Sequence, residues 1–305
     1  MILVAGGTGT LGRQVVRRLT STGTEVRVLT RVAARAQPLV GTGAEVMVGD
    51  VGDMATVRAA VAGVSAVVSA VQGFAGVDPV GARAVDLDGN ARLVQAAQAA
   101  GVRRFVLVSA MGASTDSAME LRRIKRAAEL MLEQSRLDWT VIRRTVYLET
   151  WIEILRGMAA RRQVVLLGRG RNRINFVGAD DVAALLSRVV ADNGTIEQTY
   201  EIGGPEDLTL ERVAREVLDA LDVEAPIRHV PLPIVRSIAV ATRRIKPAVA
   251  NIAEFGIVMD TTDMSLAEDT ARARYPHLPA TTLQDLLTLR VGPGQVDPAT
   301  PRHRR

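Results

Sequence analysis

The first 150 residues alternate between short apolar runs and segments with helical periodicity. The apolar runs have the length and the Val, Leu and Ala content of buried strands, and they cover 1–5, 25–31, 44–50, 65–71, 103–110 and 139–144. Between the first two runs, Leu11, Val15 and Leu19 recur at helical spacing, and Gly23 ends that helix. The pattern also predicts helices over 54–62 and 85–100. Strands that alternate with helices at this spacing predict an α/β fold, a Rossmann-type doubly wound parallel sheet.

A further helix is predicted after the fifth run. Ser117 and Glu120 have the spacing of a capping box, which satisfies free backbone N–H groups at a helix start. Apolar positions then mark one face of this helix, at Leu121, Ile124, Ala128 and Met131.

After about residue 150 the alternation loosens. The pattern predicts a helix over 151–160, a turn rich in Gly and Arg over 168–173, a loop and helix over 176–190, and a strand, turn and helix over 199–221. We expect residues 151–290 to form a smaller α/β lobe over the carboxyl edge of the sheet, interleaved with a nucleotide-binding domain of residues 1–150. Residues 291–305 are rich in Pro, Gly and Arg and are expected to be disordered.

The composition supports a buried parallel sheet and excludes several kinds of site. Hydrophobic residues make up 48% of the chain but aromatic residues only 3%, so the core consists mainly of aliphatic side chains. The absence of cysteine excludes a disulfide framework, a thiolate zinc site and a cysteine nucleophile. It also fits a reducing compartment, and a cytoplasmic location is expected. The three histidines have no ligand-like spacing, so no metal site is predicted.

The chain is basic, with a formal net charge of +5 and a pI near 10.3. We interpret this as a solvated arginine-rich surface, because no recognition helix or stacking motif for nucleic acid accompanies it. The uncharged stretch 59–77 is long enough to span a bilayer, but its Gly and Ser content favours a helix end, a turn at Gly63 and a short buried strand. Neither a signal peptide nor a membrane span is predicted.

The sequence GGTGTLG at residues 6–12 carries the strongest functional signal. It follows a strand and opens a helix, which is the context of a dinucleotide-binding loop. Gly6 permits the tight turn, Gly9 lets the backbone approach a pyrophosphate, and Gly12 lets the helix pack on the sheet. The free N–H groups of the helix start favour the anion. The predicted cofactor-binding residues are Gly6, Thr8, Gly9, Thr10, Leu11, Gly12, Arg31, Asp50, Val51, Ala70 and Lys125.

The second strand indicates which dinucleotide binds. A site for NAD usually ends this strand with an acid that holds the ribose 2′-hydroxyl, whereas this strand ends in Thr30 and Arg31. Arg31 is placed to bind a 2′-phosphate, as are Arg13 and Arg35, so the sequence favours NADP(H). Asp50 closes the third strand and either meets the adenine or is an ordinary turn aspartate.

Several segments together identify a family resemblance. They are GGTGTLGRQVVRRL, VRVLTR, GD, AGVRRFVLVSAMGA, KRAAELMLEQSRLDWTVIRR and IGGPEDLT. From residue 1 to about 290 the chain resembles an atypical short-chain dehydrogenase/reductase of the NmrA-like group. This group includes quinone and phenylpropanoid reductases, cofactor-sensing regulators and assembly factors.

The resemblance also implies catalytic residues. The family's usual pair is Tyr-x-x-x-Lys; here Lys125 falls at the lysine place and Leu121 at the tyrosine place. Ser109 resembles the family's active-site serine or threonine, and Tyr147 is a candidate proton donor or a packing tyrosine. In the alternative interpretation, Lys125 is a solvated helix lysine paired with Glu129.

Two classes of function follow. The first is an NADPH-dependent reductase of a small apolar acceptor such as a quinone, enone or aromatic carbonyl, in which the cofactor carries the chemistry. The second is a non-catalytic NADP(H)-sensing regulator or assembly factor that acts on a protein partner. The apolar stretch 226–258 is either a core helix of the smaller lobe or a helix for interaction with a partner or a membrane surface.

Overall fold

Seven parallel strands form the central sheet of the computed structural model, which describes residues 1–73 and 81–291. They are β1 (Ile2–Ala5), β2 (Val26–Thr30), β3 (Glu45–Val48), β4 (Ala66–Ser69), β5 (Arg104–Ala110), β6 (Asp138–Arg144) and β10 (Gln198–Ile202). Their order is β10-β6-β5-β4-β1-β2-β3, and every neighbouring pair is parallel. The order reverses between β1 and β4, and ligands of open α/β sheets bind at such a switch point.

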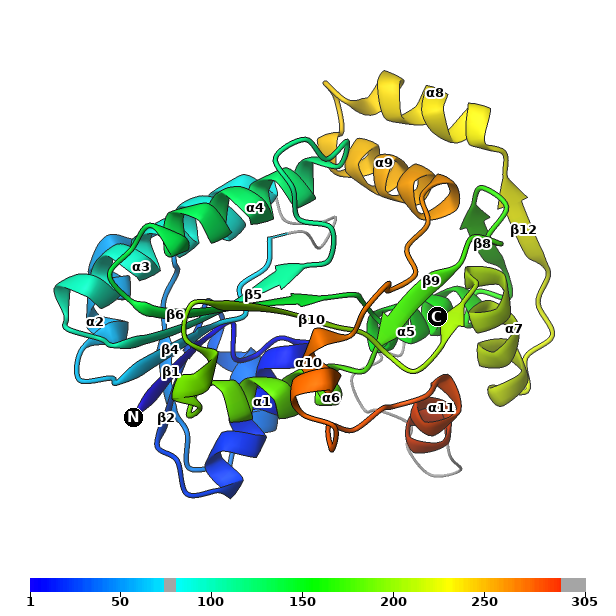
Figure 1. The fold of residues 1–305 in the computed structure, drawn as a ribbon. Coiled ribbons are helices and arrows are strands. Elements are labelled where there is room, and N and C mark those ends of the chain that lie inside the picture. Colours follow the sequence, from blue (N-terminus) through cyan, green and yellow to red (C-terminus); the bar gives the residue numbers. More distant parts are fainter. Residues whose placement is uncertain (74–80, 292–305) are drawn as a thin grey trace.

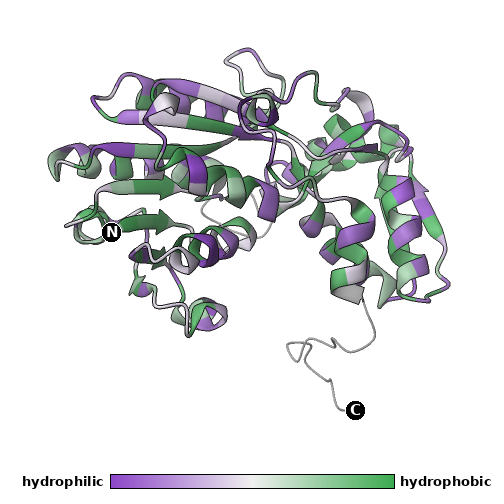
Figure 2. Cartoon of the chain, turned by 60° about the horizontal axis from the view of Figure 1, so that its bottom comes forward, coloured by the Kyte–Doolittle hydropathy of each residue, from purple (hydrophilic) through white to green (hydrophobic). Residues whose placement is uncertain are grey.

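Helices cover both faces of this sheet (Figure 1). One face carries α1 (Thr10–Ser21) and α6 (Ala179–Val189), and the other carries α2 (Met54–Val61), α3 (Asn90–Ala99) and α4 (Glu120–Glu133). The central strands are largely hydrophobic, as Figure 2 shows, because both faces are buried under helices. The predicted doubly wound fold is therefore confirmed.

The smaller lobe contains two further sheets. β7 (Val146–Tyr147), β9 (Ile174–Val177) and β11 (Asp207–Leu208) form one, and β8 (Val164–Leu167) pairs with β12 (Ile227–Val230) in the other. Five helices complete the lobe: α5 (Leu148–Ala159), α7 (Leu210–Ala220), α8 (Leu232–Thr242), α9 (Pro247–Thr261) and α11 (Leu283–Val291). The short helices η1 (Ala33–Leu39), η2 (Arg83–Gly89) and η3 (Asn193–Thr195) belong to the sheet domain.

The chain crosses between the two parts more than once. After β9 it returns to the sheet domain as α6 and β10, where β10 pairs with β6. The strand predicted at the start of 199–221 therefore completes the main sheet. Later, α10 (Thr270–Arg274) packs against β10.

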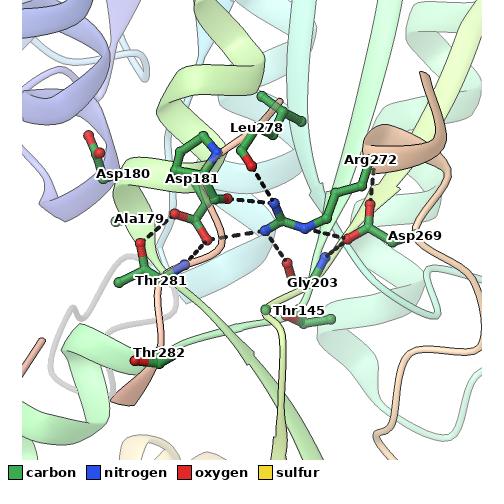
Figure 3. A network of polar contacts seen from close by, with 12 residues as sticks. Thr145, Ala179, Asp180, Asp181, Gly203, Asp269, Arg272, Leu278, Thr281 and Thr282 are labelled. Atoms are coloured by element: carbon green, nitrogen blue, oxygen red, sulfur yellow. Dashed lines mark hydrogen bonds and ion pairs between the residues drawn. The ribbon is translucent and has the colours of Figure 1, made fainter. Parts of the chain in front are cut away.

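Arg272 of α10 anchors this last crossing (Figure 3). Its guanidinium lies 3.2 Å from Asp181 Oδ2 of α6 and 3.1 Å from Asp269 Oδ2, and it donates to the carbonyl of Gly203. The N–H of Thr281 also donates to Asp181. The network ties α6, the end of β10 and the segment before α11 together.

Two local predictions have clear outcomes. The capping box is wrong: α4 begins at Glu120 with Met119 as N-cap, and the Ser117 hydroxyl instead accepts the N–H of Met119 in a local turn. The interpretation of 59–77 is confirmed over the described residues 59–73, because α2 ends at Val61, Gly63 turns with φ +72°, and β4 is buried.

Two further predictions concern a membrane span and the C-terminal tail. Among residues 1–73 and 81–291, no helix combines the length and apolar character needed to cross a bilayer. Val291 still belongs to α11, and the rest of the predicted tail lies outside the described residues.

Candidate active site

A groove lies at the switch point, where the carboxyl ends of β1, β2, β3 and β4 meet the start of α1. All eleven predicted cofactor-binding residues line it: Gly6, Thr8, Gly9, Thr10, Leu11, Gly12, Arg31, Asp50, Val51, Ala70 and Lys125. Tyr147 lines it as well, and Ser109 does not. Gln72, Arg144 and Thr150 also line this groove, and the sequence did not single them out.

Three of the four glycines of the loop, Gly6, Gly9 and Gly12, differ in what the fold requires of them. Gly6 has φ +80°, and a Cβ there would lie 2.7 Å from the carbonyl oxygen of Ala70. A Cβ on Gly12 would lie 2.2 Å from the carbonyl oxygen of Gly6. Gly9 has φ −75°, and the nearest atom to an added Cβ is 3.4 Å away. Packing therefore explains Gly6 and Gly12, whereas Gly9 keeps space open in the groove, as a bound pyrophosphate requires.

The first turn of α1 supplies donors for that anion. Gly9 is the N-cap and no side chain caps the helix, so its first N–H groups have no side-chain partner at this end. The helix dipole adds partial positive charge at the same place.

The end of β2 carries no acid. The hydroxyls of Thr8 and Thr30 are 2.9 Å apart, and the exposed side chains of Arg31 and Arg35 line the mouth of the groove. Arg13 does not line it. Asp50 Oδ1 accepts the N–H of Gly52 at 2.6 Å, so Asp50 stabilises its own turn as well as lining the groove. These residues fit a dinucleotide with a 2′-phosphate.

Lys125 lies at the inner end of the groove in a buried ion pair. Its Nζ is 2.6 Å from Asp86 Oδ1 and donates to the carbonyl of Val108 at 3.2 Å. The side chains of Lys125 and Asp86 are 4% and 0% exposed. The interpretation of Lys125 as a solvated lysine paired with Glu129 is therefore wrong.

Asp86 is itself held from two sides. Its Oδ2 accepts the N–H of Gly73 at 2.8 Å, and its backbone carbonyl accepts Asn90 Nδ2 at 2.7 Å. Ser69 Oγ, at the end of β4, donates to Asn90 Oδ1 at 2.6 Å. Asp86 lies in η2, a π-helical turn, which is a geometry that often occurs at functional sites.

Sequence reasoning missed Asp86, although a signal was present. Asp86 and Asn90 continue, at helical spacing, the buried stripe formed by Leu93 and Ala97. Polar residues in a buried stripe need partners inside the protein, so they mark a candidate site.

Ser109 is not part of the groove. Its side chain is fully buried, and its hydroxyl donates to the carboxylate of Glu129. Glu129 also pairs with Arg143 at 2.7 Å and with Arg126 at 3.0 Å. A separate buried cluster thus binds the Ser109 hydroxyl, and the active-site role that the resemblance implied for Ser109 stays a prediction.

Tyr147 lies at the end of β7, with its ring against Arg144. The guanidinium carbon of Arg144 is 4.2 Å from the ring centroid, within the range of a cation–π contact. Burial raises the pKa of Tyr147 to about 12, with the Arg144 charge acting in the opposite direction. The phenol therefore stays protonated at neutral pH and is able to donate a hydrogen bond.

A second groove lies beside the first, between the start of α4 and α9. We call it the α4–α9 groove. Its apolar wall includes Leu121 and Ile124 of α4 with Phe255, Ile257 and Val258 of α9. Arg83, Arg123, Arg243, Glu120 and Glu254 are its charged members. Leu121 and Lys125 are one helical turn apart, so α4 contributes to both grooves. Neither groove holds a metal cluster: among the described residues no three His, Asp or Glu side chains could ligate one ion.

Comparison with known proteins agrees with this site. A family described as NAD(P)H-binding matches residues 6–193. The chain is 30% identical to the NAD(P)H azoreductase of Xenophilus azovorans, over 77% of this chain and 78% of that protein. It is also 30% identical to the photosystem II assembly factor Ycf39 of Guillardia theta, over 76% of this chain and 74% of that one.

The fold has solved counterparts. The NADPH complex of the Escherichia coli quinone oxidoreductase QOR2 superposes with a TM-score of 0.75 over 95% of this chain and 99% of that one, at 23% identity. The family match over residues 6–193 includes the glycine loop, the residues that line the switch-point groove and Lys125. The chain belongs to the NAD(P)H-binding family, within the NmrA-like atypical short-chain dehydrogenases/reductases that its motifs resemble.

Proposed function

We propose that this protein is an NADPH-dependent reductase of a small apolar acceptor, such as a quinone, enone or aromatic carbonyl. The observation that carries the proposal is that α4 lines two grooves. A dinucleotide groove ends at Lys125, and an apolar groove begins one turn away at Leu121. This arrangement suits a hydride donor and an acceptor side by side.

The preference for NADPH over NADH is supported by charge at the end of β2. Arg31 and Arg35 line the mouth of the groove, and no acid stands where a ribose 2′-hydroxyl would need one. The solved relative QOR2 was complexed with NADPH, in keeping with this proposal.

In this proposal Lys125 and Asp86 position and polarise the bound reactants, and neither residue supplies the proton. When bound, NADPH supplies a hydride, and a quinone that accepts it together with one proton from water becomes a hydroquinone. The Lys125 ammonium has three donors; it donates one to the Val108 carbonyl, and its charge is paired with Asp86. A remaining donor is proposed to bind a ribose hydroxyl or the acceptor oxygen.

The residue at the tyrosine place narrows the choice of acceptor. Leu121 cannot donate a proton, so the acceptor must take its proton from water or from Tyr147. Quinones and extended enones meet this requirement more readily than simple carbonyls. Relatives named quinone oxidoreductase 2 and NAD(P)H azoreductase, whose names indicate electron-poor acceptors, support the same class. A cytoplasmic location, in keeping with the absence of cysteine, is part of the proposal.

The test is acceptor-dependent oxidation of NADPH by the purified chain. A panel of quinones, enones and aromatic carbonyls is added, and the loss of NADPH absorbance is followed. We expect turnover that falls about a hundredfold in Lys125→Met, because the variant loses the polarising charge, with Arg13→Met as a control outside the groove. Oxidation at background across the panel, in a protein that binds NADPH, overturns the reductase.

A second function is favoured by Leu121 itself. A chain that binds NADP(H) without the family's tyrosine is suited to sensing the cofactor, and several relatives are named photosystem II assembly factors. In this alternative a protein partner recognises one redox state of the cofactor. A partner captured equally with NADP⁺, with NADPH and without either contradicts it.

A further inference from the structure

The helices α8 and α9 carry an unusual share of exposed aliphatic surface. Of the twelve exposed large hydrophobic side chains among the described residues, six lie between residues 232 and 261. They are Ile234, Ile238, Val240, Ile245, Val249 and Ile252, with exposures from 36% for Ile238 to 79% for Ile245. We call residues 232–261 the α8–α9 hairpin.

No other part of the described chain covers this surface. In Figure 1, α8 lies at the outer edge of the molecule, stacked on α9. The two helices meet through a small cluster of Val235, Ala239 and Ala253, separate from the three larger cores. The exposed aliphatic residues lie outside this cluster. Six exposed aliphatic side chains within one hairpin make it a candidate interaction surface.

Basic residues accompany the apolar ones. Arg236 lies on α8, and Arg243, Arg244 and Lys246 form the connection between the helices. The acids of the hairpin are Glu254, 4.0 Å from Arg243, and Asp260, which is buried and paired with Arg169. The exposed surface is therefore aliphatic and cationic together.

We propose that the α8–α9 hairpin docks on an anionic lipid bilayer. Aliphatic side chains enter the boundary between headgroups and acyl chains, while Lys and Arg remain at the headgroup level and pair with anionic lipids. Exposed aliphatic residues together with an excess of cations over acids, in one hairpin, are the combination that such docking requires.

The same charges argue against other occupants. A second copy of the chain would bring four cations against four, with one exposed acid from each side. Protein–protein interface cores are enriched in aromatic residues, whereas the exposed large hydrophobic residues of the hairpin are all Ile and Val. The excess of cations and the purely aliphatic exposed residues therefore favour a lipid surface over a second protein as the occupant of the hairpin.

Docking would bring the acceptor site to the membrane. Phe255, Ile257 and Val258 of α9 line the α4–α9 groove, so a docked hairpin places that groove next to the lipid. This consequence rests on the proposed function: the acceptor would then be carried in the bilayer, as apolar quinones are.

The test is flotation of the full chain with vesicles, without cofactor or acceptor, so that its outcome is independent of reductase activity. Vesicles of equal parts phosphatidylcholine and phosphatidylglycerol are compared with phosphatidylcholine alone. We expect binding to the anionic vesicles that weakens with salt, and weak binding to the neutral ones. No binding to either vesicle overturns the proposal.

Two variants test the mechanism of docking. Arg243→Gln/Arg244→Gln/Lys246→Gln should weaken binding about a hundredfold, and Ile234→Gln/Ile238→Gln at least about tenfold. The matched controls are Arg58→Gln/Arg161→Gln/Arg188→Gln, with the same change in charge, and Val40→Gln/Leu289→Gln, exposed apolar residues elsewhere. Circular dichroism verifies that each variant is folded.

Each possible result of these vesicle experiments either supports the docking proposal or overturns it. Binding lost in the hairpin variants and retained in the controls supports the proposal. Equal losses in the hairpin and control variants indicate a general charge effect and overturn it. A dimer that light scattering detects and the hairpin variants abolish assigns the surface to a second copy and also overturns it.

Discussion

Lys125 Nζ and Asp86 Oδ1 lie 2.6 Å apart in a site where neither side chain is more than 4% exposed. A buried ion pair of this kind is costly to break, because removing one partner leaves the other charge without compensation. The pair joins α4 to η2 and fixes the lysine at the inner end of the dinucleotide groove.

We therefore expect Asp86→Asn to destabilise the protein by about 3 kcal/mol, with a similar effect for Lys125→Met. The double variant should lose clearly less free energy of unfolding than the two single variants together, because it buries no unpaired charge. Urea denaturation of the four proteins gives the coupling energy. Additive losses would show that the two charges do not interact.

Substitutions at Gly9 and at Gly12 should affect cofactor binding and folding, respectively. Gly9→Ala has room for its Cβ and an ordinary φ, so its free energy of unfolding should change by less than about 1 kcal/mol while NADPH affinity falls. Gly12→Ala places a Cβ 2.2 Å from a backbone oxygen, so folding itself should suffer. Thermal denaturation and fluorescence titration with NADPH measure the two effects. Unchanged affinity in a folded Gly9→Ala protein would remove the loop from the binding site.

Charge at the mouth of the groove should set the cofactor preference. Arg31→Ala and Arg35→Ala should each weaken NADPH binding about tenfold, because each removes a charged donor to the 2′-phosphate. NADH has no such phosphate, so its affinity should hardly change. Arg13→Ala, outside the groove, is the control for the loss of one positive charge. Parallel losses for both cofactors would point to a different role for these arginines.

The Tyr147 phenol should lose its proton at a higher pH in the folded protein than in the unfolded one. Burial raises its pKa to about 12, and Tyr275 is also raised to about 12. A raised pKa means that the folded state keeps a proton that the unfolded state loses near pH ~10, so the contribution of Tyr147 to stability declines as pH rises from about 10 toward 12. Tyrosinate absorbance of folded Tyr147→Phe should therefore match the wild type at about pH 10.5 and differ only above it. In denaturant the difference should appear near pH ~10 instead.

The network in Figure 3 should depend on pH as well. Burial raises the pKa of Asp181, and Thr281 and Arg272 lower it. Arg272→Ala removes one lowering partner and leaves Asp181 buried without its cation, at a cost of about 3 kcal/mol at neutral pH. Because protonation removes the unpaired charge, the deficit should shrink as pH falls toward about 4. Urea denaturation of both proteins across this range, with Arg272→Lys as the charge-conserving control, tests the sign.

The strands and helices of the central sheet and the glycine loop could be predicted because each depends on residues close together in the sequence. Apolar runs of strand length alternate with helical stripes, and the loop residues lie within seven positions of one another. The pairing of β10 with β6 could not be assigned in the same way, because β7, α5, β8, β9 and α6 separate the two strands in the sequence. Strand pairing depends on the whole fold, whereas the strand itself depends on its own residues.

The candidate site shows the same division. Lys125 could be placed by its motif, but its partner Asp86 comes from another helix, and the pair forms only when the chain is folded. Ser109 lies at the expected strand end, but its hydroxyl donates a hydrogen bond to Glu129 of α4. Motif positions therefore locate a residue on the backbone, and neighbours distant in sequence decide where its side chain points.

The return of the chain to the sheet after β9 has a consequence for how this protein divides. With α6 lying over α1, and β10 alongside β6, the segment from β7 to β9 is an excursion between two visits of the chain to one sheet. A fragment cut at residue 150 would expose the backbone donors and acceptors of β6 along a bare edge, and such edges promote aggregation. Residues that follow the excursion thus cover the edge of the nucleotide-binding half, and we expect a fragment that folds on its own to extend at least to the end of β10.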